Sequence, residues 1–315
     1  MQSAETSHSQ RRHTQRRHTG LGVAALFVAT LFWSTGGVFG RKAAVGGVVL
    51  SFWRMWIALV VMSVVMAVMR RPIRLRDIRG GAVMGVMFGF NICAFFIALE
   101  HIPVAVALII GALTPVIALP IAVFAMGERM TAVKAWCAFA AVVGVVCAVL
   151  TAPSSKGSSN SAVGYVWAVL SLLVWVGYLL LSKQARRTVG TLELMWVMAF
   201  LGSITVSAIV LFTRSHVGEM HGTGWLWVSL LTLGPGLLGH GLFAWAQPRV
   251  EASVSSVLIQ LEPVTASMIA WMMLGQRVSL SQALSMAVVV AALSVLAWAE
   301  TRERPAAVAL PPNAP

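Results

Sequence analysis

The chain has 315 residues, of which 58% are hydrophobic and only 10% are charged, and its mean hydropathy is +0.85. Soluble domains have about 25% charged residues, so this composition excludes an ordinary soluble protein. Runs of roughly 20 apolar residues, long enough to cross about 30 Å of hydrocarbon, fill most of the chain. The formal net charge of +13 follows from membrane topology and does not indicate a nucleic-acid partner. We predict an all-α membrane protein.

In chain order, residues 1–19 are polar and basic, and we expect a disordered tail. The next apolar run is too long for a signal peptide, so we expect it to be retained. A Ser/Pro-rich linker, residues 151–161, separates two five-span repeats, 20–150 and 162–299, and residues 300–315 form a second tail. The ten predicted spans are 20–40, 49–69, 80–99, 103–125, 131–150, 162–182, 192–213, 225–246, 252–274 and 279–299.

The lysines and arginines are distributed unequally between the two sides of the membrane. With the N-terminus in the cytoplasm, 17 of them fall on the inner side and five on the outer side, and Arg54 lies within a span. Cytoplasmic loops carry an excess of Lys and Arg. We therefore expect both termini to lie in the cytoplasm.

An internal repeat relates the two halves of the chain. LTPV at 113–116 and LEPV at 261–264 are each followed, after ten residues, by G-x-R, and one offset of 148 relates the two segments. Trp33 and Trp175 correspond at an offset of 142. Because each half has an odd number of spans, we expect the second to be inverted relative to the first. Inverted repeats place a substrate path at their interface and allow alternating access.

These features resemble the drug/metabolite transporter superfamily, and more narrowly its EamA-type bacterial transporters. The resemblance includes FWR at 52–54 and GHGLFAWA at 239–246. Gln276 departs from the family pattern, which usually repeats the glutamate found at Glu128. The resemblance implies a bacterial inner-membrane protein and secondary transport, most often export, of small polar metabolites such as amino acids, or of drugs. It does not identify the substrate.

Glu262 is the first candidate for a functional residue, because it lies in an apolar span where ionisable groups are costly and usually functional. Removal from water disfavours the charged form of a carboxyl group, so Glu262 could bind and release a proton. Its counterpart in the first half is Thr114, so the helical frame does not require an acid there. The alternatives are a protonated Glu262 bonded to a neighbouring helix and a carboxylate that caps amides beside Pro263.

Pro115 and Pro263 occupy equivalent positions, and each removes a helix hydrogen bond. Paired breaks of this kind point to a binding site in an inverted-repeat transporter, although packing kinks give the same pattern. Arg54 could hold a substrate carboxylate. Alternatively, it could extend to the lipid headgroups or pair with Glu262.

His240 lies in a Gly-rich span with Pro235, which could act as a hinge. A histidine can relay protons, but a neutral ring bonded to a backbone carbonyl is the simpler alternative. The remaining candidates offer rings and hydrogen-bonding groups that could line a substrate path, or could serve only in packing or face lipid; they are Asn91, Trp33, Trp175 and Tyr178.

We therefore expect a secondary transporter that exports a small molecule, with proton coupling through Glu262 as a hypothesis. No nucleophile–base pair, ATP-binding loop, metal cluster or cofactor motif stands out, and the expected partners are the substrate, protons and the bilayer. An uptake carrier or uniporter of the same fold is the nearest alternative. A membrane-embedded lipid enzyme or a scaffold protein would leave the repeat unexplained.

Overall fold

The computed structural model describes residues 2–126, 130–152, 161–185, 189–246, 250 and 258–303, and all regular structure in them is helical. The helices of the first half are α1 (Gln2–Lys42), α2 (Gly47–Val68), α3 (Leu75–His101), α4 (Val104–Gly111), α5 (Thr114–Met126) and α6 (Ala132–Leu150). Those of the second half are α7 (Ala162–Ala185), α8 (Thr191–Thr213), η1 (Val217–Glu219), α9 (Gly224–Leu231), η2 (Thr232–Gly239), α10 (His240–Ala246), α12 (Glu262–Leu274) and α13 (Leu280–Glu303).

Nine segments of the described residues are long and apolar enough to cross a membrane, and they match nine of the ten predicted spans. The other predicted span, 252–274, is described from residue 258 onward and contains α12. The prediction of an all-α membrane protein is confirmed. The inverted relation between the two halves stays a prediction.

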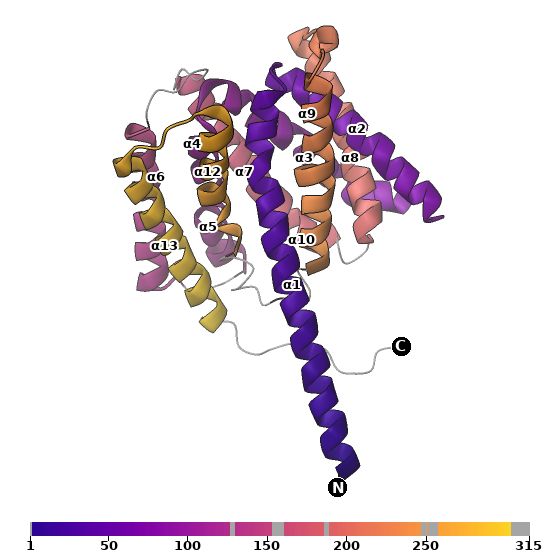
Figure 1. Ribbon diagram of the computed structural model, residues 1–315, viewed down its shortest axis with the longest axis vertical. Coiled ribbons are helices and arrows are strands. Elements are labelled where there is room, and N and C mark those ends of the chain that lie inside the picture. Colours follow the sequence, from indigo (N-terminus) through magenta and orange to yellow (C-terminus); the bar gives the residue numbers. More distant parts are fainter. Residues whose placement is uncertain are drawn as a thin grey trace.

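Helix α1 begins at Gln2, so it extends through the basic segment that we expect to be a disordered tail, and it reaches well beyond the other helices (Figure 1). Its apolar part, Gly20–Lys42, is the first predicted span. The division of the chain into tails, repeats and linker stays a prediction. The first-half G-x-R motif at 127–129, which includes Glu128, lies outside the described residues.

Helices from the two halves pack against each other throughout the bundle. The most extensive contacts join α3 to α7 and α8, α6 to α13, α2 to α8, and α1 to α12 and η2. In Figure 1, α6 and α13 lie together on one side, α2 and α8 on the other, and α1 runs between them. The core of the protein is therefore an interface between the halves.

Glycines allow α3 and α8 to approach closely. Gly81, Gly85 and Gly89 recur every four residues on α3, so they lie on one face of the helix. A Cβ atom added to Gly89 would lie 2.7 Å from the Cα atom of Gly202 on α8. Small residues at this spacing support close packing of membrane helices, because the backbones themselves are in contact.

The outer surface of the bundle is apolar. Phe124, Phe212 and Leu150 expose 89%, 90% and 79% of their surface, and many other large hydrophobic residues are similarly exposed. A soluble monomer rarely exposes a continuous apolar surface larger than a few hundred Å². This surface suits the hydrocarbon of a bilayer, and the chain is a multi-pass membrane protein.

Candidate functional site

A cavity of about 620 Å³ lies between the two halves. Helices α1, α2, α3, α4 and α5 of the first half and α7, η2, α10, α12 and α13 of the second all contribute to its wall. Nine residues singled out in the sequence line this one cavity: Trp33, Arg54, Asn91, Pro115, Trp175, Pro235, His240, Glu262 and Pro263. The structure therefore brings together residues that lie up to 230 positions apart (263 − 33) in the sequence.

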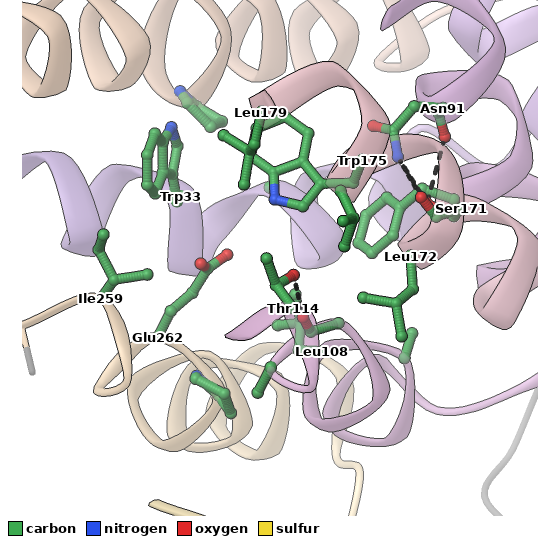
Figure 2. A pocket seen from close by; sticks show the side chains of 18 of the residues that line it. Trp33, Asn91, Leu108, Thr114, Ser171, Leu172, Trp175, Leu179, Ile259 and Glu262 are labelled. Carbon is green, nitrogen blue, oxygen red and sulfur yellow. Dashed lines mark hydrogen bonds between the residues drawn. The ribbon is translucent and has the colours of Figure 1, made fainter. Parts of the chain in front are cut away.

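Glu262 is the first residue of α12, and its carboxylate points into the cavity toward the rings of Trp33 and Trp175 (Figure 2). Among the residues that the structure describes, none forms a hydrogen bond or an ion pair with this carboxylate. At the N-cap of α12, Leu261, no side chain caps the helix with a hydrogen bond. Glu262 is therefore an acidic group presented to the cavity.

The two Pro-containing segments start helices at equivalent positions. Helix α5 begins at Thr114 and α12 at Glu262, which are 148 residues apart. Pro115 has no N–H to donate to the carbonyl of Gly111, four residues earlier. The hydroxyl of Thr114 donates to that carbonyl instead, at 2.7 Å (Figure 2). The predicted fourth span is thus divided into α4 and α5, and its break lies in the cavity wall.

The start of α12 is attached to α1 by hydroxyl groups. The Oγ atom of Ser34, which is fully buried, lies 2.5 Å from the Oγ1 atom of Thr265. Thr265 lies one turn after Glu262, and its hydroxyl also donates to the carbonyl of Leu261 at 2.9 Å. These contacts hold the beginning of α12, and with it Glu262, against α1.

Arg54 is buried on α2, with only 6% of its surface exposed, and it lines the cavity. Its Nε atom has no hydrogen-bond partner, and its guanidinium carbon lies 5.4 Å from the centre of the Phe96 ring. The structure buries Arg54 in the cavity wall, and no ion pair with Glu262 forms among the described residues. The role of Arg54 stays a prediction.

Aromatic rings form one wall of the cavity. Trp33 contacts His240 with ring centres 5.1 Å apart and Phe243 at 4.9 Å. Trp175 stacks on Tyr178 at 4.9 Å with an interplanar angle of 23°. Tyr178 is itself 5% exposed and does not line the cavity, so it supports the Trp175 ring from behind.

Phe243 was not singled out as a site residue in the sequence, although a signal was available. At the offset of 148, Phe243 corresponds to Phe95, and both residues line the cavity. An aromatic residue that occurs at equivalent positions of both halves can therefore mark the shared path. Phe88, which also lines the cavity and contacts His240 at 5.7 Å, has no such signal.

Asn91 connects two helices that face the cavity. Its side-chain amide donates to the carbonyl and to the hydroxyl of Ser171 on α7, at 2.8 Å and 2.9 Å (Figure 2). Asn91 is 7% exposed, so these bonds satisfy a donor that has little access to water. Ser171 was missed in the sequence, because a serine in an apolar run does not indicate its partner.

The eighth predicted span is irregular where it meets the cavity. Helix α9 continues into the π-helical segment η2, which contains Pro235, and then into α10, which begins at His240. Pro235 cannot donate the usual hydrogen bond to the carbonyl of Leu231, which accounts for the wider turn. Turns of this kind occur often at functional sites.

Polar contacts hold the end of the bundle at which α1 and α3 end and α4 begins. The Nη2 atom of Arg41 donates to the carbonyl of Ile102 at 2.7 Å. The backbone N–H of Val104 donates to Oε1 of Gln276 at 3.2 Å. Gln276 thus joins the loop after α12 to the first residue of α4, and a neutral side chain is sufficient for this role.

The fold and sequence match known proteins over most of the chain. Residues 20–150 and 162–298 match the EamA-like transporter family. An uncharacterized transporter of Archaeoglobus fulgidus is 25% identical over 215 residues, which cover 68% of this chain and 74% of that protein. A solved crystal structure is similar with a TM-score of 0.63 at 20% identity, over 90% of this chain and 99% of that one; this likeness concerns the fold alone.

Proposed function

The chain belongs to the EamA-like transporter family of the drug/metabolite transporter superfamily, and from this premise we propose that it is a proton-coupled secondary exporter. Its cargo is a small polar metabolite, such as an amino acid or related compound, or a drug. Export proceeds by alternating access, with the two halves moving relative to each other around the cavity. The matching family and the Archaeoglobus fulgidus relative are transporters, so we do not expect the chain to be an enzyme.

The observation that carries this proposal is the position of Glu262. Its carboxylate faces the cavity between the halves, and no described residue pairs with it. An ionisable group within a membrane is costly and marks ion or substrate pathways. A carboxyl group that no neighbour neutralises can instead be neutralised by a proton, and its deprotonation can accompany the change of cavity access.

The distribution of basic residues supports the direction of insertion. With both termini in the cytoplasm of a bacterial cell, the described loop between α2 and α3 is on the inner side and contains Arg70, Arg71 and Arg74. The short loop between α1 and α2 then lies outside. This is the asymmetry that orients inner-membrane proteins.

The test uses purified full-length protein in proteoliposomes with a pooled panel of labelled amino acids, with and without an imposed pH gradient. Wild type and Glu262→Gln are compared, and Glu219→Gln, which alters an exposed carboxylate in η1, serves as the matched control. One pH unit supports about tenfold accumulation for one proton per substrate. We expect Glu262→Gln to lose this accumulation but to retain exchange without a gradient.

Equal accumulation by Glu262→Gln and wild type would contradict proton coupling through this residue. Wild-type flux that equilibrates the substrate but never responds to the gradient would identify a uniporter. The Glu219→Gln control should behave as wild type in both assays, because its side chain lies outside the cavity.

A further inference from the structure

Arg54 is the most unusual polar group of the cavity wall. It lies on α2 with 6% of its surface exposed, among apolar residues such as Phe96. Its Nε–H has no acceptor, and no carboxylate of the described residues lies within ion-pair distance. A guanidinium group has five N–H donors and keeps its charge. Among the described residues, the positive charge of Arg54 therefore has no carboxylate partner.

The contact with Phe96 does not replace an anion. The ring face lies 5.4 Å from the guanidinium carbon and attracts the cation. However, an aromatic ring accepts no directed pair of N–H bonds, whereas a carboxylate accepts two parallel bonds from the guanidinium fork. A buried charge without a counter-ion is strongly unfavourable, so the stability of the fold does not account for Arg54 at this place.

The backbone of η2 passes close to the guanidinium group and places no side chain against it at residue 236. A Cβ atom added to Gly236 would lie 3.8 Å from both Nε and Nη2 of Arg54. Since residue 236 is a glycine, no side chain stands between η2 and these donors. Pro235, the neighbouring residue of η2, lines the cavity as Arg54 does.

We propose that Arg54 is the anion-binding subsite of the cavity and that it selects substrates carrying a carboxylate group. The carboxylate accepts hydrogen bonds from the guanidinium, and the apolar or aromatic body of the substrate lies against the ring wall of Trp33, Trp175 and Phe243. Glu262, on the same cavity, stays available for a proton. This inference rests on the proposed transport function and names its substrate class.

The test measures binding to the full-length protein in detergent by calorimetry, using probes with one ring and one chain length. The probes are 3-phenylpropionate, 3-phenylpropanol and 3-phenylpropylamine, which share the ring and the number of carbon atoms and end in a carboxylate, a hydroxyl and an ammonium group. We expect wild type to bind the carboxylate at least about tenfold more tightly than the alcohol. Arg54→Gln should remove this preference while binding of the alcohol stays unchanged.

Two further variants keep the result decisive. Arg54→Lys retains the charge but not the planar fork, so it should retain part of the preference even if Arg54→Gln does not fold. Arg277→Gln removes an exposed arginine that does not line the cavity, and it should bind all three probes as wild type does.

Equal binding of 3-phenylpropionate and 3-phenylpropanol by wild type would overturn the proposal, as would a preference for the amine or a carboxylate preference that survives Arg54→Gln. No pH gradient is present in this assay. Its failure therefore leaves the proton coupling of Glu262 untouched, and loss of coupling in proteoliposomes leaves the preference at Arg54 untouched.

Discussion

Helices α5 and α12 begin at equivalent positions beside a proline, but the first residue is Thr114 in α5 and Glu262 in α12. In the first half, the hydroxyl of Thr114 donates to the carbonyl of Gly111, which Pro115 cannot bond. In the second half, Glu262 occupies the equivalent position and extends its carboxylate into the cavity, where no described residue pairs with it. Both halves therefore share the helix start beside a proline, but only the second half has a carboxylate at this position.

The neighbours of the two segments differ in the same way. Ser34 on α1 contacts Thr265 on α12 through hydroxyl groups. Their counterparts in the repeat are Val176 on α7 and Ile117 on α5, which belong to the apolar core. The segment that carries the acid is thus the one fixed by polar contacts. Hydrogen bonds fix position and orientation more strictly than apolar contact does, which suits a segment that presents a functional group.

We expect the largest effect when Glu262 in α12 is replaced by threonine, the residue at the equivalent position of α5. Glu262→Thr should abolish pH-driven accumulation, which would otherwise reach about tenfold per pH unit for one proton per substrate. The helix start itself should persist, because threonine occupies the equivalent position in α5. Transport in proteoliposomes, with helicity measured by circular dichroism, checks this. Accumulation that survives the substitution would mean that the difference between the segments has no role in coupling.

The second prediction concerns the ring beside Glu262. A Cβ atom added to Gly239 would lie 2.8 Å and 2.9 Å from two atoms of the Trp33 indole. The equivalent first-half residue, Asn91, bonds to Ser171 instead. Gly239→Ala should therefore displace Trp33 and destabilise the protein by about 1–3 kcal/mol, as overpacking does. The measurement is the thermal unfolding midpoint in detergent.

Gly241→Ala is the matched control for this change. A Cβ atom at position 241 would meet nothing within 4 Å, and alanine favours helix over glycine by about 1 kcal/mol. The midpoint of this variant should equal or slightly exceed that of wild type. If both variants unfold at the same temperature, the close contact at Trp33 does not constrain the cavity wall.

A smaller effect is expected from making the α1–α12 contact apolar, as it is in the first half. Ser34→Ala removes the hydroxyl that meets Thr265. Loss of one buried hydrogen bond costs about 0.5–1.5 kcal/mol, so the unfolding midpoint should fall modestly. Ser281→Ala removes a hydroxyl contact with Ser279 at an exposed position of α13, where water can replace it, and should leave the midpoint unchanged. A drop of equal size in both variants would show that the contact has no special part in holding α12.

The smallest effect is expected at the first-half segment. Thr114→Val removes the bond to Gly111, but that carbonyl borders the cavity, where water can replace the hydroxyl. The free energy of unfolding should change by less than about 1 kcal/mol, and pH-driven accumulation should equal that of wild type. A loss of accumulation in Thr114→Val would show that the two segments act symmetrically after all.

Many residues of the candidate site could be predicted because membrane spans contain few polar residues. In apolar spans the few polar groups and prolines are conspicuous, and Glu262, Arg54 and His240 stood out for that reason. The repeat then indicated which positions correspond. Three features were not predictable: the π-helical turn at η2, the bond from Asn91 to Ser171, and the absence of a pair between Arg54 and Glu262.

By itself, the sequence determined the helical class, nine spans that the structure describes as helices, the family, and the equivalence of Thr114 and Glu262. These properties depend on composition, length and spacing, which are local. Only the tertiary structure decided that residues of both halves share one cavity, that Tyr178 supports Trp175 from behind, and that Arg54 and Glu262 stay apart. The physical reason is that contact between helices depends on the rotation of each helix about its axis and on its neighbours, and an apolar sequence in a membrane constrains neither strongly.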